Sequence, residues 1–461
     1  MPTAEANPLT EFQWSPQPQA QKFIRDIVDD VLRRCPAAAD LARRMKDQTG
    51  TRFIDWIGHI TLSPEDPRAT RAEEVGYVVD STPEDLTVYK HPAGMFPTVV
   101  ICELGGGAVE ISLKVESVAD FLAANQIDAR IEGEPLSDIR LALIGKADGV
   151  LLRVAERHGT GGFDLPGEAP KHAINRLFHL ERFRLRRRNF DSESDGFAHA
   201  QKLIDAAIAD LGVDLTCDLF FTAEREYWQN RNRAAQVQKA RQDKLGLGWA
   251  NHDHHTYRSS REHFTRLIAV WEKLGFKCRE RFYAGREAGW GAQVMEQSNT
   301  GIITFNDVDL SPDELMGDFS HEPLPPRDKL GTVGLWCALH GEAFLQAGMH
   351  HLECQFDFES LRLQLEAEAG VKTMKPFTNF AYLRQAFTEG ERWPVSEHRI
   401  GRALKAGYIT EEQAKQFREN GAIGSHLENL ERNDGFKGFN QTGVSEIISA
   451  TDPRKHSRYN A

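Results

Sequence analysis

Apolar and polar positions along the chain follow helical and strand periods in turn. Residues 20–32 and 37–45 carry apolar side chains at three- and four-residue spacing, which predicts two N-terminal helices. From about residue 53 to residue 157 the period shortens to two, as in residues 108–115, and only residues 118–125 favour a helix. Charged helical sequence follows to about residue 244. The pattern predicts an α+β protein.

Two stretches in the second half repeat one order of elements. In the first, a strand, a helix and three strands are expected at residues 254–258, 261–274, 277–283, 292–296 and 301–306. In the second, a strand, a helix and two strands are expected at residues 351–356, 358–369, 378–383 and 386–392. Ser260 and Asp357 are good helix N-caps, and each lies six residues after a histidine. Aligning the helix starts superimposes His254 on His351, which predicts tandem βαβββ modules.

Breaks in pattern and composition divide the chain into five expected segments. His59 and Glu156 lie near the two ends of the second segment, and we expect them to be structural because no third ligand stands out. The C-terminal segment carries helical patterns at residues 397–406 and 411–420. The segments are N-terminal helices (1–50), a βαβββ-like region expected to hold no metal (51–165), a helical connector (166–247), paired βαβββ modules (248–395) and a C-terminal helical cap with a tail (396–461).

The charge and the cysteine content argue against two classes of function. The formal net charge of −12 argues against general nucleic-acid binding, which depends on Lys and Arg neutralising phosphates. Six scattered cysteines without a CxxC pair argue against a cysteine zinc cluster and fit reduced thiols. The first residues show no signal-peptide pattern, and no apolar run is long enough to cross a membrane. We expect a soluble cytoplasmic protein.

The paired modules place candidate metal ligands at corresponding positions. A histidine on the first strand of each module and a carboxylate on a last strand could meet in a half-barrel around one metal. The histidines are His254 and His351, since His255 should point to the other face of its strand. The carboxylate is Glu389 or Glu391, which share one strand face, so the period cannot choose between them. His350 is the alternative to His351.

These residues resemble a known group of enzymes. The His/His/Glu order in two βαβββ modules resembles the vicinal oxygen chelate superfamily, and it is most similar to the 2-oxoadipate dioxygenase/decarboxylase (hydroxyglutarate synthase) family. That family has a metal-binding His followed four residues later by a substrate-binding Arg, as His254 and Arg258 are here. The stretch from His350 to Glu353 is similar to the strand of its second His, although His350 stands where the family has Asn.

The resemblance extends to the C-terminal part of the chain. Residues 387–391 and the later Gly-Arg-Ala-Leu at residues 401–404 are similar to the family's Glu-bearing strand and the helix after it. Val444 and Ser445 resemble a C-terminal Val-Ser whose backbone helps to hold the substrate.

The resemblance implies a non-haem iron(II)-dependent dioxygenase that decarboxylates and hydroxylates a small 2-oxo acid. Its ligands would be His254, His351 and Glu389, and Arg258 would bind a substrate carboxylate. An oxygen-independent isomerase or lyase of the glyoxalase type, with zinc, nickel or manganese, is the alternative. In that alternative, Glu391 would transfer a proton to or from the substrate while the metal polarises a carbonyl group. A non-catalytic small-molecule-binding protein also remains open, as does the choice between monomer and homodimer.

Overall fold

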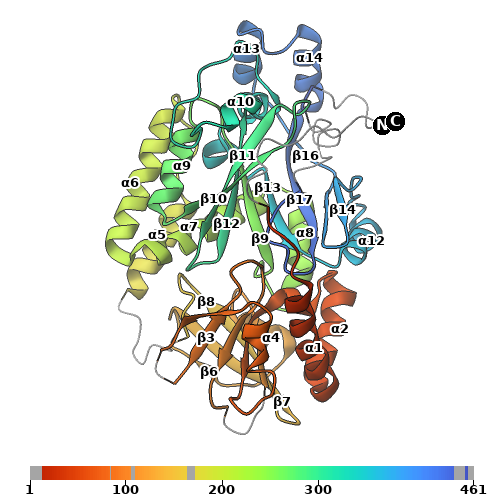
Figure 1. Cartoon of the computed structure of the whole chain (residues 1–461). Coiled ribbons are helices and arrows are strands. Elements are labelled where there is room, and N and C mark those ends of the chain that lie inside the picture. The colour runs from red at the N-terminus through yellow and green to blue at the C-terminus, as the bar shows by residue number, and fades with distance from the viewer. Residues whose placement is uncertain (1–12, 84, 105–108, 164–171, 441–451, 455–461) are drawn as a thin grey trace.

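The computed structural model describes residues 13–83, 85–104, 109–163, 172–440 and 452–454. Two curled mixed sheets, one from each half of the chain, carry helices on their outer faces (Figure 1). The structure confirms the predicted α+β class, with βαβββ modules that form a half-barrel.

The N-terminal sheet consists of two βαβββ units side by side, in the strand order β2-β3-β4-β1-β5-β8-β7-β6. In each unit the first strand runs parallel to the last, and the two first strands pair antiparallel. The first unit comprises β1 (Ile57–Leu62), α3 (Arg71–Glu74), β2 (Val78–Ser81), β3 (Thr87–Lys90) and β4 (Thr98–Ile101). The second comprises β5 (Val109–Lys114), α4 (Val118–Asn125), β6 (Ile131–Glu132), β7 (Ile139–Ala147) and β8 (Val150–Arg157). The sequence pattern predicted only α4, because α3 is too short to show a helical period.

The C-terminal sheet repeats this arrangement in the order β10-β11-β12-β9-β13-β17-β15-β14. Its first unit comprises β9 (His252–Arg258), α9 (Phe264–Lys273), β10 (Lys277–Tyr283), β11 (Trp290–Gln297) and β12 (Ile302–Asp309). Its second comprises β13 (His351–Gln355), α12 (Phe358–Ala369), β14 (Thr378–Phe380), β15 (Leu383–Phe387) and β17 (Ala422–Arg432). Asp357 caps α12 as predicted, since its side chain accepts from the Ser360 backbone N–H. The prediction for Ser260 was wrong, because α9 begins only after His263.

The last strand of the second unit is not where the sequence pattern placed it. Residues 386–392 do not form one strand: β15 ends at Phe387, and a short β16 (Glu391–Trp393) pairs with one end of β17. Two helices, α13 (Glu397–Lys405) and α14 (Glu411–Asn420), separate β16 from β17. Nearly every residue of β17 is buried, so polar and apolar residues occur on both faces and the alternation that reveals a strand is missing.

Helices join and cover the two sheets (Figure 1). The N-terminal pair, α1 (Pro18–Arg34) and α2 (Pro36–Thr49), buries an apolar stripe in the core of the N-terminal half. The connector holds α5 (Ala173–Arg184), α6 (Glu193–Leu211), α7 (Val213–Gln229) and α8 (Arg233–Asp243). Two further helices, α10 (Pro312–Leu315) and α11 (Thr332–His340), lie between the C-terminal units. In the part of the chain that the structure describes, no helix combines the length and apolarity needed to cross a membrane.

Candidate metal centre

Three adjacent strands at the middle of the C-terminal sheet bring polar side chains to one buried point. In the strand register His254 on β9 lies opposite Glu353 on β13, and Glu353 lies beside Glu428 on β17. His351 begins β13, two residues before Glu353, so the period of two puts both on one face. All four side chains are almost fully buried.

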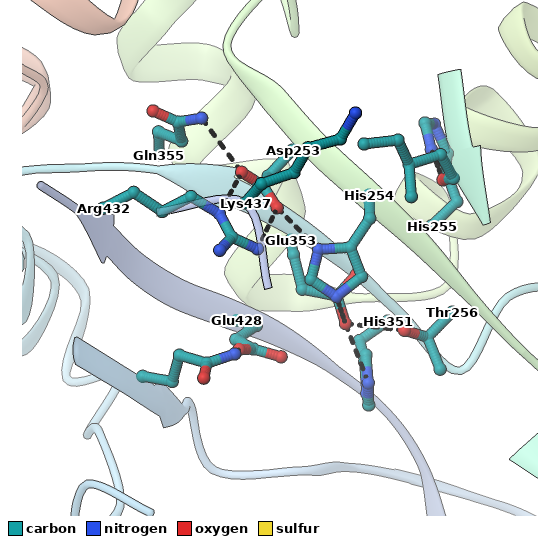
Figure 2. A network of polar contacts seen from close by, with 12 residues as sticks. Asp253, His254, His255, Thr256, His351, Glu353, Gln355, Glu428, Arg432 and Lys437 are labelled. Atoms are coloured by element: carbon teal, nitrogen blue, oxygen red, sulfur yellow. Dashed lines mark hydrogen bonds and ion pairs between the residues drawn. The ribbon is translucent and has the colours of Figure 1, made fainter. Parts of the chain in front are cut away.

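Three of the four groups, His254, Glu353 and Glu428, lie close enough together to hold one small ion, and His351 contacts one of them. The Nε2 atoms of His351 and His254 lie 2.9 and 3.4 Å from Glu353 Oε1 (Figure 2). Ligand atoms of His254, Glu353 and Glu428 all lie within 4.8 Å of one another. The Thr256 hydroxyl donates to Glu353 Oε1 at 2.7 Å, which orients this carboxyl.

A second layer of contacts holds His254 in place. Its Nδ1 lies 2.8 Å from Asp253 Oδ1, so Nδ1 carries the proton and Nε2 presents its lone pair to the cluster. Arg432 donates to both oxygens of Asp253, at 2.8 and 2.9 Å, and the Gln355 amide donates to one of them at 2.9 Å (Figure 2). On the other side of the cluster, the Gln385 amide donates to Glu428 at 2.9 Å.

Burial sets the protonation states of the cluster. It lowers the pKa of His254 despite the neighbouring Asp253, and it lowers the pKa of His351 still further. It raises the pKa of Glu353 well above its usual range and that of Glu428 to about 8. Neutral imidazoles and carboxylates that lack a cation of their own are the donor set that a divalent metal compensates. The residues therefore fit a metal ion.

A small cavity of about 50 Å³ opens beside the cluster. One buried cation, Arg258 from β9, reaches it and lies 3.4 Å from Asp307 Oδ2 on β12. Burial raises the pKa of Asp307 to about 7 in spite of this guanidinium, and its Oδ1 has no hydrogen-bond partner among the described residues. The rest of the wall is mainly aromatic: Phe282, Trp290, Phe305, Phe377, Phe387 and Phe439.

The structure brings together some of the candidate residues and separates others. His254, His351 and Arg258 reach the same cavity. Glu389 is exposed, and Glu391 accepts a hydrogen bond from the Arg233 backbone N–H at 3.1 Å, so neither lies in the cluster. The physical reason is that both follow the end of β15, where the backbone leaves the half-barrel face. Val444 and Ser445 lie outside the described residues.

The alternative histidines face away from the cluster. His255 packs edge-on against Phe221 at 5.0 Å between ring centres. His350 is hydrogen-bonded through Nδ1 to the Gly424 carbonyl oxygen at 2.9 Å. Both are accounted for by structural contacts.

Two acidic residues of the cluster were not among the residues predicted from the sequence. Glu353 could have been found, since it follows His351 by two residues on the same expected strand. Glu428 could not, because its strand was not recognised.

Comparisons with known proteins add little beyond this geometry. No family model and no curated protein matches the chain. Among solved structures, the chain resembles a putative glyoxalase superfamily protein from Ralstonia eutropha JMP134 at 12% identity, covering 59% of this chain and 96% of that one, with a TM-score of 0.33. A mutant of 4-hydroxymandelate synthase from Streptomyces coelicolor also matches at 12% identity, over 86% of this chain and 97% of that one, with a TM-score of 0.26.

A third structural neighbour is methylmalonyl-CoA epimerase from Mycobacterium tuberculosis. The identity is 12%, the match covers 40% of this chain and 88% of that one, and the TM-score is 0.24. With scores this low, the case for a function depends on the residues of the site itself.

Proposed function

We propose that His254, His351 and Glu428 hold a divalent metal and that the chain is an iron(II)-dependent dioxygenase of a small 2-oxo acid. The observation that carries this proposal is the convergence of two neutral imidazoles and a carboxylate from three adjacent strands, next to a buried arginine. Two histidines and one carboxylate leave coordination positions open, as non-haem iron oxygenases require. Glu353, at the centre of the cluster, is a fourth candidate ligand.

The reaction is an oxidative decarboxylation. When bound, the metal would supply redox chemistry toward dioxygen and polarise the substrate's oxygens. One oxygen atom of dioxygen enters the new carboxylate and the other a new hydroxyl group, while the original carboxylate leaves as carbon dioxide.

The chain's own residues bind and shield the substrate. Arg258 is placed to pair with a substrate carboxylate, because its contact with Asp307 is long, at 3.4 Å, and uses a single nitrogen. Within the described part of the chain, the other guanidinium nitrogens remain available for a two-bond pair with a substrate carboxylate. The aromatic wall excludes water from the reacting atoms. Asp253 keeps the imidazole of His254 in the orientation in which Nε2 faces the cluster.

Substrate binding should weaken as the pH rises through about 7. Below that value Asp307 is protonated, since burial raises its pKa to about 7, and the charge of Arg258 is available to the substrate. Above it, the Asp307 carboxylate competes for the same guanidinium. We expect KM to rise by up to about tenfold per pH unit across this range, and Asp307→Asn to remove most of the rise.

KM measured against pH for wild type, Asp307→Asn and Asp313→Asn checks this expectation. Asp313 is an exposed acid on α10, so its substitution makes the same charge change outside the cavity. An unaltered pH profile in Asp307→Asn would exclude the competition between Asp307 and substrate.

A second candidate function is an oxygen-independent isomerase or lyase with zinc, nickel or manganese. Glu353 favours it, because a second buried carboxyl beside the candidate ligands can carry a proton to or from the substrate. The two functions differ in their need for dioxygen.

Metal analysis of anaerobically purified protein tests both. About one iron per chain, together with oxygen uptake on adding 2-oxo acids, is the result expected of the dioxygenase. Stoichiometric zinc, nickel or manganese without oxygen uptake would favour the isomerase or lyase. Failure to bind any of these metals would leave only a non-catalytic small-molecule-binding protein.

A further inference from the structure

The N-terminal half-barrel repeats the strand register of the C-terminal sheet, but the position that corresponds to Glu428 carries a residue of opposite charge. In the C-terminal sheet, β13 links His254 on one neighbouring strand to Glu428 on the other. In the N-terminal sheet, β5 links His59 to Arg153 in the same way. His59 and His254 are each the third residue of their strand. Arg153 therefore stands where Glu428 stands in the other sheet.

An ion pair fills the position that corresponds to the metal cluster. Arg153 donates to Glu110 at 2.7 Å and to Glu132 at 2.7 Å. Glu110 pairs with Thr61 across β1 and β5, as His351 pairs with Thr256 across β9 and β13. A guanidinium therefore supplies positive charge at this position.

The contacts of Glu156 also separate it from His59. Glu156 accepts from the Val118 backbone N–H at 2.8 Å and contacts His158 at 3.0 Å, whereas the His59 ring packs on Phe163. His59 and Glu156 therefore make separate contacts.

A cavity of about 520 Å³ lies between this half-barrel and the C-terminal half. Its walls come from β1, β5 and β8, from the loop after β8, from α7 and from the turn between β11 and β12. Phe163, Trp249 and Ile302 contribute apolar surface. The volume falls in the range of small-molecule sites, roughly 300–1,000 Å³.

Three cationic side chains in this wall have no carboxylate partner among the described residues: Lys114, Arg157 and Arg225. The Arg157 guanidinium lies over the Phe163 ring, 4.9 Å from its centre, and donates to the Gly162 carbonyl. Arg225 contacts His255 and the Thr222 hydroxyl. The acids of the wall are already engaged, in the pairs Asp218–His158 (3.0 Å), Glu116–Lys239 (3.3 Å) and Glu226–Arg184 (2.5 Å).

Lys114 is held in this position by the packing of its stem. Its Cγ lies 3.0 Å from where a Cβ on Gly58 would be, so the stem runs close along the glycine on β1. Burial lowers the pKa of Lys114, and the carboxylates that oppose this shift, Asp55 and Asp253, are ion-paired with Arg52 and Arg432. An unpaired cation in such a place costs stability unless a ligand compensates it.

We propose that this cavity binds an organic anion, a phosphate or carboxylate attached to an apolar group, at a site separate from the metal centre. Lys114, Arg157 and Arg225 bind the charged group, and the apolar wall of Phe163, Trp249 and Ile302 receives the remainder. The site does not depend on the metal or on the reaction proposed above.

Calorimetric titration of the full-length protein with phenyl phosphate and with phenylacetate tests the proposal. We expect saturable binding of one molecule per chain, and the tighter of the two probes identifies the preferred anion. Lys114→Met should weaken binding by at least about tenfold, because it removes a charged hydrogen-bond donor. Lys146→Met, an exposed lysine on β7 of the same sheet, makes the same charge change and should leave binding unaltered.

Thermal unfolding supplies a second readout. Without an anion, Lys114→Met should unfold at a slightly higher temperature than wild type, because a half-buried cation that pairs with no carboxylate among the described residues has been removed. The rise in unfolding temperature that the anion causes in wild type should shrink in this variant. His351→Ala should bind the probes as tightly as wild type. The proposal is overturned if neither probe binds saturably, if both lysine variants lose binding equally, or if His351→Ala abolishes it.

Discussion

Glu428→Gln should lower the affinity for the metal by at least about 100-fold and abolish turnover, whereas Glu389→Gln should change neither. Substituting a residue that only orients a ligand already costs about 10–100-fold in metal affinity, so loss of a ligand should cost at least as much. Glu428 lies in the buried cluster with His254, while Glu389 is exposed. The two changes are chemically identical and preserve side-chain size.

Competition with a chromophoric chelator, together with metal analysis after gel filtration, measures this difference directly. Thermal unfolding of both variants in chelator shows whether each is folded without metal. If Glu389→Gln lost the metal and Glu428→Gln kept it, the ligand would be the one that the sequence resemblance implies, and the cluster would have another role.

The contrast between Glu389 and Glu428 shows which parts of the candidate site could be predicted from the sequence. The first strand and helix of each C-terminal unit were predicted within about three residues, because their apolar spacing, and for α12 also the Asp357 cap, leave clear local signals. Those elements carry His254, Arg258 and His351, and the structure brings all three to one cavity.

The last strand of the second unit, β17, was not predicted, and the reason is physical. β17 is the partner of β13 and lies at the middle of the sheet, where both faces are covered. Its sequence has no polar–apolar alternation, and α13 and α14 place it far along the chain from β15. A local pattern cannot show which distant strand completes a sheet, so Glu428 could not be predicted as a member of the cluster.

The duplication of the half-barrel was also only partly visible. A single βαβββ-like region was expected before residue 165, whereas two units are present there. The register makes the two sheets comparable residue by residue, and this comparison shows that Arg153 replaces Glu428. At corresponding places, one half-barrel thus gathers carboxyl groups with candidate metal ligands, whereas the other holds the ion pairs of Arg153 with Glu110 and Glu132.

Arg432→Met should lower the free energy of unfolding by about 3–5 kcal/mol, the usual cost of leaving one member of a buried ion pair alone. Asp253 and Arg432 are both buried and share two hydrogen bonds of 2.8 and 2.9 Å. Arg432 also donates to the carbonyl oxygens of Phe436 and Gly438, so it connects the chain after β17 to Asp253 beside the buried cluster. Arg418→Met, which breaks an exposed two-bond pair with Glu397, should leave stability nearly unaltered.

The pH dependence of the loss identifies its cause. Burial alone would raise the pKa of Asp253, but Arg432 and His254 outweigh it and hold this pKa below its ordinary value. In wild type the pair therefore stabilises the fold above about pH 4 and loses its effect as the pH falls. In Arg432→Met burial should raise the pKa of Asp253, so the unfolding free energies of variant and wild type should converge in acid and separate toward neutral pH.

Chemical denaturation at about pH 4 and about pH 7 measures this separation, and a double-mutant cycle with Asp253→Asn isolates the pair. Removing both charges should cost less than removing Arg432 alone, since no unpaired carboxylate remains. Equal losses at both pH values would mean that the hydrogen bonds of Arg432 to Phe436 and Gly438, rather than its charge, stabilise this part of the fold. A loss that grows with pH would instead show that Arg432 maintains the ionised Asp253, which orients His254 toward the buried cluster.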